Sequence, residues 1–140
     1  MINFWETCDP VFSHIEINDY LGDFDTLTKS WENNFKEWEK SFNINFYSIM
    51  IMTNTILPFM IKNNNGSIIN IYGGGSTTSR PDFSSYAISK TALVRYTEIL
   101  SDELSNTKIK VNSISPGVMA TNMIKQVIKY KKSICSRTWF

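Results

Sequence analysis

The clearest pattern along the chain is a helical one that begins near Trp31. Aromatic residues then recur at spacings of about four between Trp38 and Phe46, which is the repeat of one helix face. The pattern predicts a helix to Ile61, with Pro58 bending or interrupting its last turns. The apolar run at its end contains Ser, Thr, Asn and Pro and falls short of about 20 continuous apolar residues. We therefore expect a buried helix here and no membrane partner.

Two short apolar runs after this helix predict buried strands. Ser67–Tyr72 is β-branched and apolar at nearly every position, as expected for a strand that a parallel sheet buries on both faces. Ile109–Ser115 alternates between apolar and polar residues. Between them lies an amphipathic segment that Ser84 or Ser85 can cap and that runs to Leu104. Alternating helices and strands predict an α/β fold, and a helix that crosses over between two strands predicts that they pair in parallel.

The length of 140 residues suits one domain. Residues 1–30 contain Pro10, Gly22 and scattered aspartates, which predict an irregular segment with room for one short helix. Residues 125–140 form a basic tail. The start of the chain has no basic region followed by an apolar one, so it does not resemble a secretory signal.

Composition excludes several classes of function. The net charge of +1 gives no electrostatic reason for a nucleic-acid partner. Cys8 and Cys135 lie at opposite ends of the chain without CxxC spacing, and His14 is the single histidine. We therefore expect no metal site and no Ser-His-Asp triad. The two cysteines fit a reducing compartment, which predicts a cytoplasmic location.

One pair of residues carries recognisable chemistry. Tyr86 and Lys90 lie four residues apart in the predicted second helix and so share a face. A free phenol has a pKa of about 10, and a nearby ammonium favours the phenolate and lowers that pKa. The pair therefore suits general acid/base catalysis near neutral pH. The alternative is an ordinary solvated pair on a helix surface.

Further residues in order along the chain extend this pair into a recognisable set. Asn45 lies in FNINF, Tyr86 and Lys90 lie in SSYAISK, and Pro116 and Gly117 lie in SISPGVMAT. Over about residues 36 to 123 this set resembles the short-chain dehydrogenase/reductase family. The resemblance implies a Rossmann-like parallel sheet layered with helices, and NAD or NADP as cofactor. It also implies hydride transfer on a small carbonyl or alcohol substrate.

The resemblance assigns expected roles to these residues. Tyr86 would be the catalytic acid/base, and Lys90 would also hold the nicotinamide ribose. Asn45 would support a water relay to that lysine, unless it is only a helix residue bonding locally. The residues expected along the nicotinamide half of the cofactor are Pro116, Gly117, Val118 and Thr121, of which the last also suits a helix N-cap. The helices matching Trp38–Ile61 and Ser85–Leu104 would form the interface of a homo-oligomer.

The chain also departs from the family pattern. The family serine about thirteen residues before the tyrosine falls on Gly73, and either Ser76 or Tyr72 could replace it. No GxGxxG turn follows a strand, so the first strands and the phosphate-binding turn of the family are missing. We therefore expect part of a reductase, cut at both ends, whose binding of NAD or NADP is doubtful. The alternative is a non-catalytic remnant, or a module that forms oligomers by pairing its helices.

Overall fold

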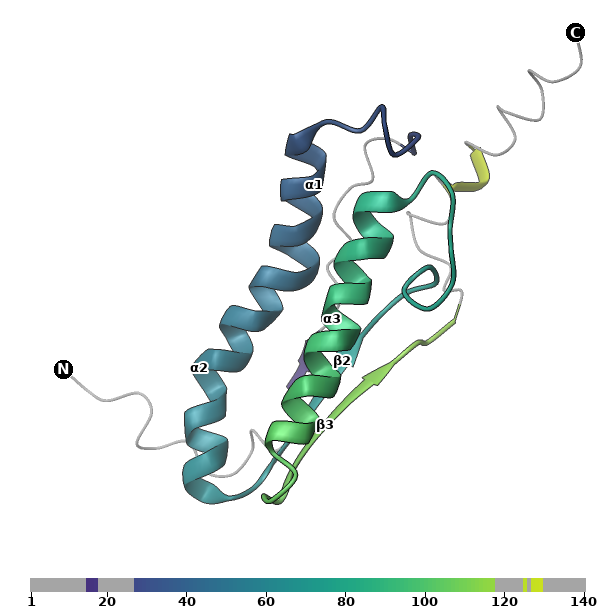
Figure 1. Ribbon diagram of the computed structural model, residues 1–140. Coiled ribbons are helices and arrows are strands. Elements are labelled where there is room, and N and C mark those ends of the chain that lie inside the picture. The colour runs from purple at the N-terminus through teal and green to yellow at the C-terminus, as the bar shows by residue number, and fades with distance from the viewer. Residues whose placement is uncertain (1–14, 18–26, 118–124, 126, 130–140) are drawn as a thin grey trace, which may run out of the picture.

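The described part of the chain folds into a parallel sheet with helices packed against it. The computed structural model describes residues 15–17, 27–117, 125 and 127–129. Its elements in order are β1 (Ile15–Ile17), α1 (Phe35–Phe42), the π-helical turn η2 (Asn43–Tyr47), α2 (Ser48–Asn63), β2 (Gly66–Ile71), α3 (Ser84–Glu103) and β3 (Ile109–Ile114). The strand order is β1-β2-β3. Figure 1 shows α3 lying across β2 and β3, with the continuous helix α1–η2–α2 running alongside α3.

The predicted parallel pairing of the two apolar strands is confirmed. β2 and β3 pair in parallel from Gly66 opposite Ile109 to Ile71 opposite Ile114. The backbone N–H of Tyr72 donates to the carbonyl of Ile114 at 3.0 Å and extends the ladder by one step. Because α3 makes the connection between these strands, they form a β-α-β unit, and the α/β fold follows from it.

Strand β1 was not predicted, since it lies in the segment that the sequence indicated to be irregular. It has three residues and pairs in parallel with Ile68–Asn70. A strand this short has too few positions to show an alternating pattern. Its hydrogen bonds come from β2, so the partner strand determines its conformation more than its own sequence does.

The first long helix departs from the prediction at both ends and in its middle. Asn34 caps its start by accepting the N–H of Glu37 on its side-chain oxygen at 3.1 Å. It ends where Asn64 takes a left-handed conformation with φ of 47°. Pro58 lies within α2 without ending it. The irregularity falls at η2 instead, as a single π-helical turn.

The predicted serine cap of α3 is wrong. Phe83 occupies the N-cap position and makes no side-chain cap bond. The two serines bond to the neighbouring helical segment instead. Ser84 accepts the Asn33 amide at 3.5 Å, and the Ser85 hydroxyl accepts that of Ser41 at 3.3 Å. Both serine side chains therefore bond to a neighbouring segment, although the local sequence predicts that one of them caps α3.

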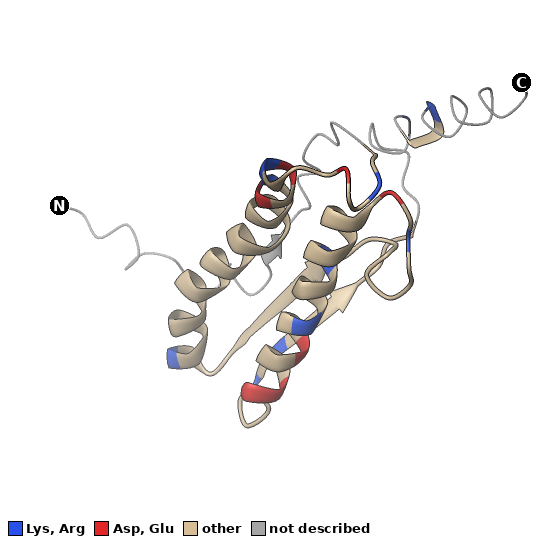
Figure 2. Ribbon diagram, turned by 45° about the horizontal axis from the view of Figure 1, so that its top comes forward, with Lys and Arg blue, Asp and Glu red and all other residues tan. Residues whose placement is uncertain are grey.

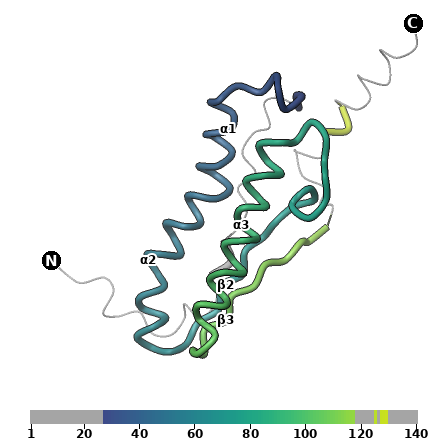
Figure 3. The backbone as a smooth tube through the Cα atoms, viewed as in Figure 1, coloured from purple at the N-terminus to yellow at the C-terminus, as the bar shows by residue number. Residues whose placement is uncertain are grey.

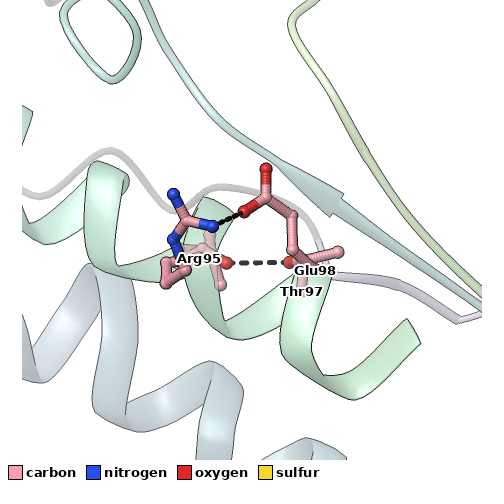
Figure 4. Close-up of polar contacts among 4 residues, drawn as sticks. Arg95, Thr97 and Glu98 are labelled. Atoms are coloured by element: carbon pink, nitrogen blue, oxygen red, sulfur yellow. Dashed lines mark hydrogen bonds and ion pairs between the residues drawn. The ribbon is translucent and has the colours of Figure 1, made fainter. Parts of the chain in front are cut away.

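The core lies between the end of α2, the inner side of α3 and the sheet. Its main cluster consists of Met60, Ile68, Leu100, Leu104, Ile109 and Val111. One polar pair crosses it, since the buried Asn70 amide donates to the Thr97 hydroxyl at 2.8 Å. Figure 4 shows Thr97 bonding back within α3, to the carbonyl of Leu93. It also shows Arg95 paired with Glu98 at 2.7 Å, on side chains that are 75% and 50% exposed. An exposed pair of this kind adds little stability.

The long helix is buried on one side only, which corrects the expectation of a buried helix. Phe35–Asn63 is 29 residues long and apolar enough to cross a membrane by length and composition. Only 22% of its apolar window is buried, which leaves Ile51 59% and Phe59 53% exposed. The run Ser41–Ile61 carries no charged residue, and Figure 2 shows charge only near the two ends of this helix. A large uncharged helix surface therefore faces outward.

The carboxyl ends of β2 and β3 lie together at one edge of the sheet. In Figure 3 the chain leaves β2, curls through a tight loop and enters α3, and the end of β3 rises beside that loop. Ligands of open α/β sheets bind outside this edge. A ligand bound at this edge would therefore contact the loop Tyr72–Phe83 and the start of α3.

Candidate active site

Lys90 is a fully buried charged residue on the sheet side of α3. Its side chain is 0% exposed, and its Nζ donates to the carbonyl of Ile71, the last residue of β2, at 3.2 Å. A buried ammonium requires hydrogen-bond acceptors, because leaving it unpaired costs far more than leaving a polar group unpaired. Lys90 therefore fixes α3 to the carboxyl end of β2.

Tyr86 lies one turn before Lys90 and on the same side of α3. It is 4% exposed. Its hydroxyl lies directly against the backbone of Gly73, so closely that a Cβ atom on Gly73 would overlap the phenol oxygen. The structure thus brings the ammonium to Ile71, the last residue of β2, and the phenol to Gly73, two residues further along the chain. Both lie on one side of α3, as their spacing of four predicts.

The glycine at position 73 has a clear spatial reason. The Tyr86 hydroxyl occupies the volume that any larger residue at this position would need. Ser76 does not take over as a donor in this conformation, since its hydroxyl donates to the Gly73 carbonyl at 2.8 Å. The carbonyl of Ser76 in turn accepts the hydroxyl of Thr91 on α3 at 3.1 Å. Ser76 therefore stabilises the turn that begins at Gly73. Tyr72, the residue immediately before that turn, is half-buried.

Arg80 closes the same loop from its far side. Its Nη1 donates to the carbonyl of Gly74 at 3.3 Å, and its guanidinium lies 4.4 Å from the centre of the Phe83 ring. Such a cation–π contact restrains a guanidinium that would otherwise move freely. Sequence reasoning did not select Arg80, because its neighbours in the loop are small and polar.

Asn45 reaches α3 one residue before Lys90. It lies in η2 and is 6% exposed. Its amide nitrogen donates to the Ser89 hydroxyl at 3.1 Å, and that hydroxyl donates to the carbonyl of Tyr86 at 2.8 Å. The carboxamide therefore connects to the backbone of the helix that carries both candidate catalytic residues. Ser89 was not selected from the sequence, although its spacing of four from Ser85 is a usable signal.

The residues after β3 are only partly described. Pro116 and Gly117 follow β3 directly and are exposed. Gly117 has φ of 78°, which favours glycine, and a Cβ there would meet nothing within 4 Å. Val118 and Thr121 lie outside the described residues. Among the residues that the structure describes, no group of three or more His, Cys, Asp or Glu side chains could hold a metal ion.

Comparison with known proteins identifies one family. A family model described as short chain dehydrogenase matches residues 25–132. The human protein named dehydrogenase/reductase SDR family member 4 is 29% identical over 119 residues, which cover 85% of this chain and 41% of that protein. This chain therefore spans about two fifths of the length of that relative.

Two solved structures show the same arrangement of elements. One is a short chain dehydrogenase of Shigella flexneri in complex with NADP, with a TM-score of 0.66 and 27% identity over 73% of this chain and 42% of that one. The other is 4-hydroxyisoleucine dehydrogenase in complex with NADH, with a TM-score of 0.64 and 27% identity over 74% of this chain and 46% of that one.

The contact between Gly73 and Tyr86 predicts a specific coupling. Gly73→Ala should destabilise the protein by about 1–3 kcal/mol, the usual cost of overpacking. In a Tyr86→Phe background this cost should fall, because the overlapping oxygen is gone and the nearest remaining ring atom, Cζ, lies 3.1 Å from where the added Cβ would be. Urea unfolding of the four proteins of this cycle measures the coupling.

Gly74→Ala is the matched control for that cycle. A Cβ on Gly74 would meet Arg80 Nη1 at 2.9 Å, which is the far end of a long side chain and can shift by weakening one exposed hydrogen bond of 3.3 Å. Its cost should therefore be small and unchanged by Tyr86→Phe. Equal costs of Gly73→Ala in both backgrounds would show that the phenol does not occupy this space.

Proposed function

This chain belongs to the short-chain dehydrogenase family, and we propose that it carries the proton-transfer machinery of an NAD(P)-dependent oxidoreductase. The substrate would be a small carbonyl or alcohol compound. The observation that carries the proposal is the pairing of Tyr86 and Lys90 at the carboxyl end of β2, where the phenol lies against Gly73 and the ammonium donates to Ile71.

Tyr86 is the proposed general acid/base. In the direction of reduction it would give its proton to the substrate oxygen, and in oxidation it would accept that proton. The ammonium of Lys90 favours the phenolate form by its charge. Asn45 supports the arrangement from the neighbouring helix, through Ser89 and the carbonyl of Tyr86.

The described residues that we propose for cofactor binding would contact its nicotinamide end. A bound nicotinamide would supply or accept the hydride. Lys90 and Tyr86 are hydrogen-bond donors suited to its ribose hydroxyls, and Pro116 and Gly117 follow the adjacent strand at the same edge. We propose Val118 and Thr121 for the same half of the cofactor from the family pattern. Relatives in complex with NADP and with NADH support either cofactor.

One feature of the site lowers the expected rate. Gly73 stands where the family places a serine that polarises the substrate carbonyl, and the Ser76 hydroxyl is bonded to the Gly73 carbonyl. Tyr86 would then donate to the substrate oxygen without a serine hydroxyl at position 73 beside it. Removal of one oxyanion donor costs roughly 3–4 kcal/mol in comparable acyl-transfer enzymes. Any turnover should therefore be slow.

The proposal predicts that turnover depends on the Tyr86 hydroxyl. NADH or NADPH oxidation with a panel of small ketones and aldehydes, at millimolar cofactor, should be slower by about 10²–10⁴ in Tyr86→Phe, the usual contribution of a general acid. Tyr96→Phe removes a phenol from the same helix, one whose hydroxyl donates to Asn54 of α2, and should leave the rate unchanged. A rate that survives Tyr86→Phe would refute the assignment.

The affinity for the cofactor should be low in this 140-residue polypeptide. No GxGxxG turn is present to place backbone N–H groups on the pyrophosphate. Each hydrogen bond to a charged group is worth about 1.5–3 kcal/mol, and a tenfold change in affinity corresponds to about 1.4 kcal/mol. Losing several should lower the affinity for NAD(H) or NADP(H) by several orders of magnitude relative to a complete relative.

Calorimetric titration with NADH, NADPH and nicotinamide mononucleotide tests this. If only the nicotinamide end is held, the mononucleotide should bind about as weakly as the whole dinucleotide. Micromolar binding of NADH or NADPH would contradict the prediction and would indicate a phosphate site in residues 1–30.

A second candidate function is that of a non-catalytic module that pairs its helices in a homo-oligomer. The observation that favours it is the uncharged outer surface of Ser41–Ile61, on which Ile51 and Phe59 are more than half exposed. Ile99 on α3 is 48% exposed as well. Exposed apolar surface of this extent on neighbouring helices is typical of an interaction site.

This candidate predicts a self-association that single charges disrupt. In sedimentation equilibrium the protein should be a dimer or larger, and Ile51→Lys should shift it toward monomer, because a buried unpaired charge is costly. Asn112→Lys is the matched control, since Asn112 is exposed on β3. A monomeric wild-type protein, or equal effects of both substitutions, would exclude this surface as the interface.

A further inference from the structure

Ser48 stands at the end of the π-helical turn and satisfies two backbone carbonyls at once. Its N–H donates to the carbonyl of Asn43, five residues back. In an α-helix that N–H would instead bond to Ile44, four residues back. The Ile44 carbonyl is not left without a donor, because the Ser48 hydroxyl donates to it at 2.6 Å. One residue thus supplies both bonds that the turn needs.

The turn keeps the same side of the long helix against α3. Ser41 bonds to Ser85, and Asn45 bonds to Ser89, and the partners in each pair are 44 positions apart in the sequence. The next step along, Ile49, is buried in one cluster with Leu93. Three positions spaced four residues apart therefore face α3, two before the end of the turn and one after it.

A regular α-helix would not preserve these contacts. If the N–H of Ser48 bonded to the carbonyl of Ile44 instead of that of Asn43, the turn would contain one residue fewer. The part of the helix before the turn would then rotate relative to the part after it by about 100°, the α-helical angle per residue. Either Asn45 would leave Ser89, or Ile49 would leave Leu93. The π-helical register is therefore what holds Asn45 at the candidate active site.

We propose that Ser48 is a positioning residue of this site, whose hydroxyl stabilises the π-helical turn that places Asn45 against Ser89. Ser48 itself is exposed and touches neither Tyr86 nor Lys90 through any described hydrogen bond. Its action is indirect, through the register of the helix. The catalytic meaning of this role rests on the proposed function, whereas the positioning itself does not.

Ser48→Val and Ser48→Thr form the decisive pair of variants. Valine and threonine have nearly the same shape, but only threonine keeps a hydroxyl that can bond to the carbonyl four residues back. We expect Ser48→Val to shift the Asn45 side-chain amide signals in ¹H–¹⁵N spectra and to speed backbone amide exchange across Asn43–Ile49 by about tenfold, equivalent to 1.4 kcal/mol. Ser48→Thr should restore both to wild-type values.

Thr55→Val is the matched control in the same helix. The Thr55 hydroxyl makes the same type of bond, to the Ile51 carbonyl at 2.8 Å, but within the regular part of α2. Its loss should leave the Asn45 signals and the exchange across η2 unchanged. Neither measurement needs cofactor or turnover, so an inactive protein would count against the proposed function without affecting this test.

Two results would overturn the proposal. The first is an unchanged Asn45 signal in Ser48→Val, which would show that the turn forms without the hydroxyl. The second is an equal response in Ser48→Thr and Ser48→Val, which would show that bulk and not the hydroxyl matters. If Ser48→Val fails to fold while Ser48→Thr folds with wild-type signals, the hydroxyl is again the required group.

Discussion

The buried ammonium of Lys90 is the constraint on which the rest of the site depends. Because a charge with 0% exposure must have acceptors, Lys90 holds α3 at the depth where its Nζ reaches the carbonyl of Ile71. With α3 fixed there, the residue one turn earlier meets the loop that leaves β2, and Tyr86 comes against Gly73. The loop then has little freedom, since Ser76 and Thr91 tie it to itself and to α3.

The second support of the site comes from the neighbouring helix and depends on a local departure from α-helical geometry. Asn45 makes a polar contact with Ser89, and Ile49 makes an apolar contact with Leu93. Both contacts belong to the interface between the first long helix and α3. In an α-helix, which has 3.6 residues per turn, residues spaced four apart gradually rotate away from one side of the helix. A turn with bonds between residues five apart rotates less per residue, which offsets that drift. Irregular turns of this kind are frequent at functional sites, and here the packing of two helices gives a physical reason for one.

The sequence predicted what depends on local repeats and missed what depends on distant partners. Ile68 and Val111 lie in short apolar runs, and their strands and parallel pairing were predicted correctly. The four-residue spacing of Tyr86 and Lys90 was enough to place both on one side of a helix. The strand at Ile15–Ile17 was missed because β2 supplies its bonds. The π-helical turn was missed because the contacts that accompany it, of Asn45 with Ser89 and of Ile49 with Leu93, join segments 44 positions apart in the sequence. The Gly73–Tyr86 contact joins residues on different elements, so no local pattern could reveal it.

The structure also bears on how much the presence of Tyr86 and Lys90 says about catalysis. Each has a structural role that needs no cofactor, because Lys90 bonds to the end of β2 and Tyr86 fills the space beside Gly73. Their presence is therefore weaker evidence for catalysis than the motif alone suggests. Catalysis also needs binding energy from parts of the ligand that do not react. The oxidoreductase and the helix-pairing module thus share one stable framework. The two candidate functions differ in whether the cofactor's pyrophosphate is contacted by protein groups at the edge of the sheet where β2 and β3 end.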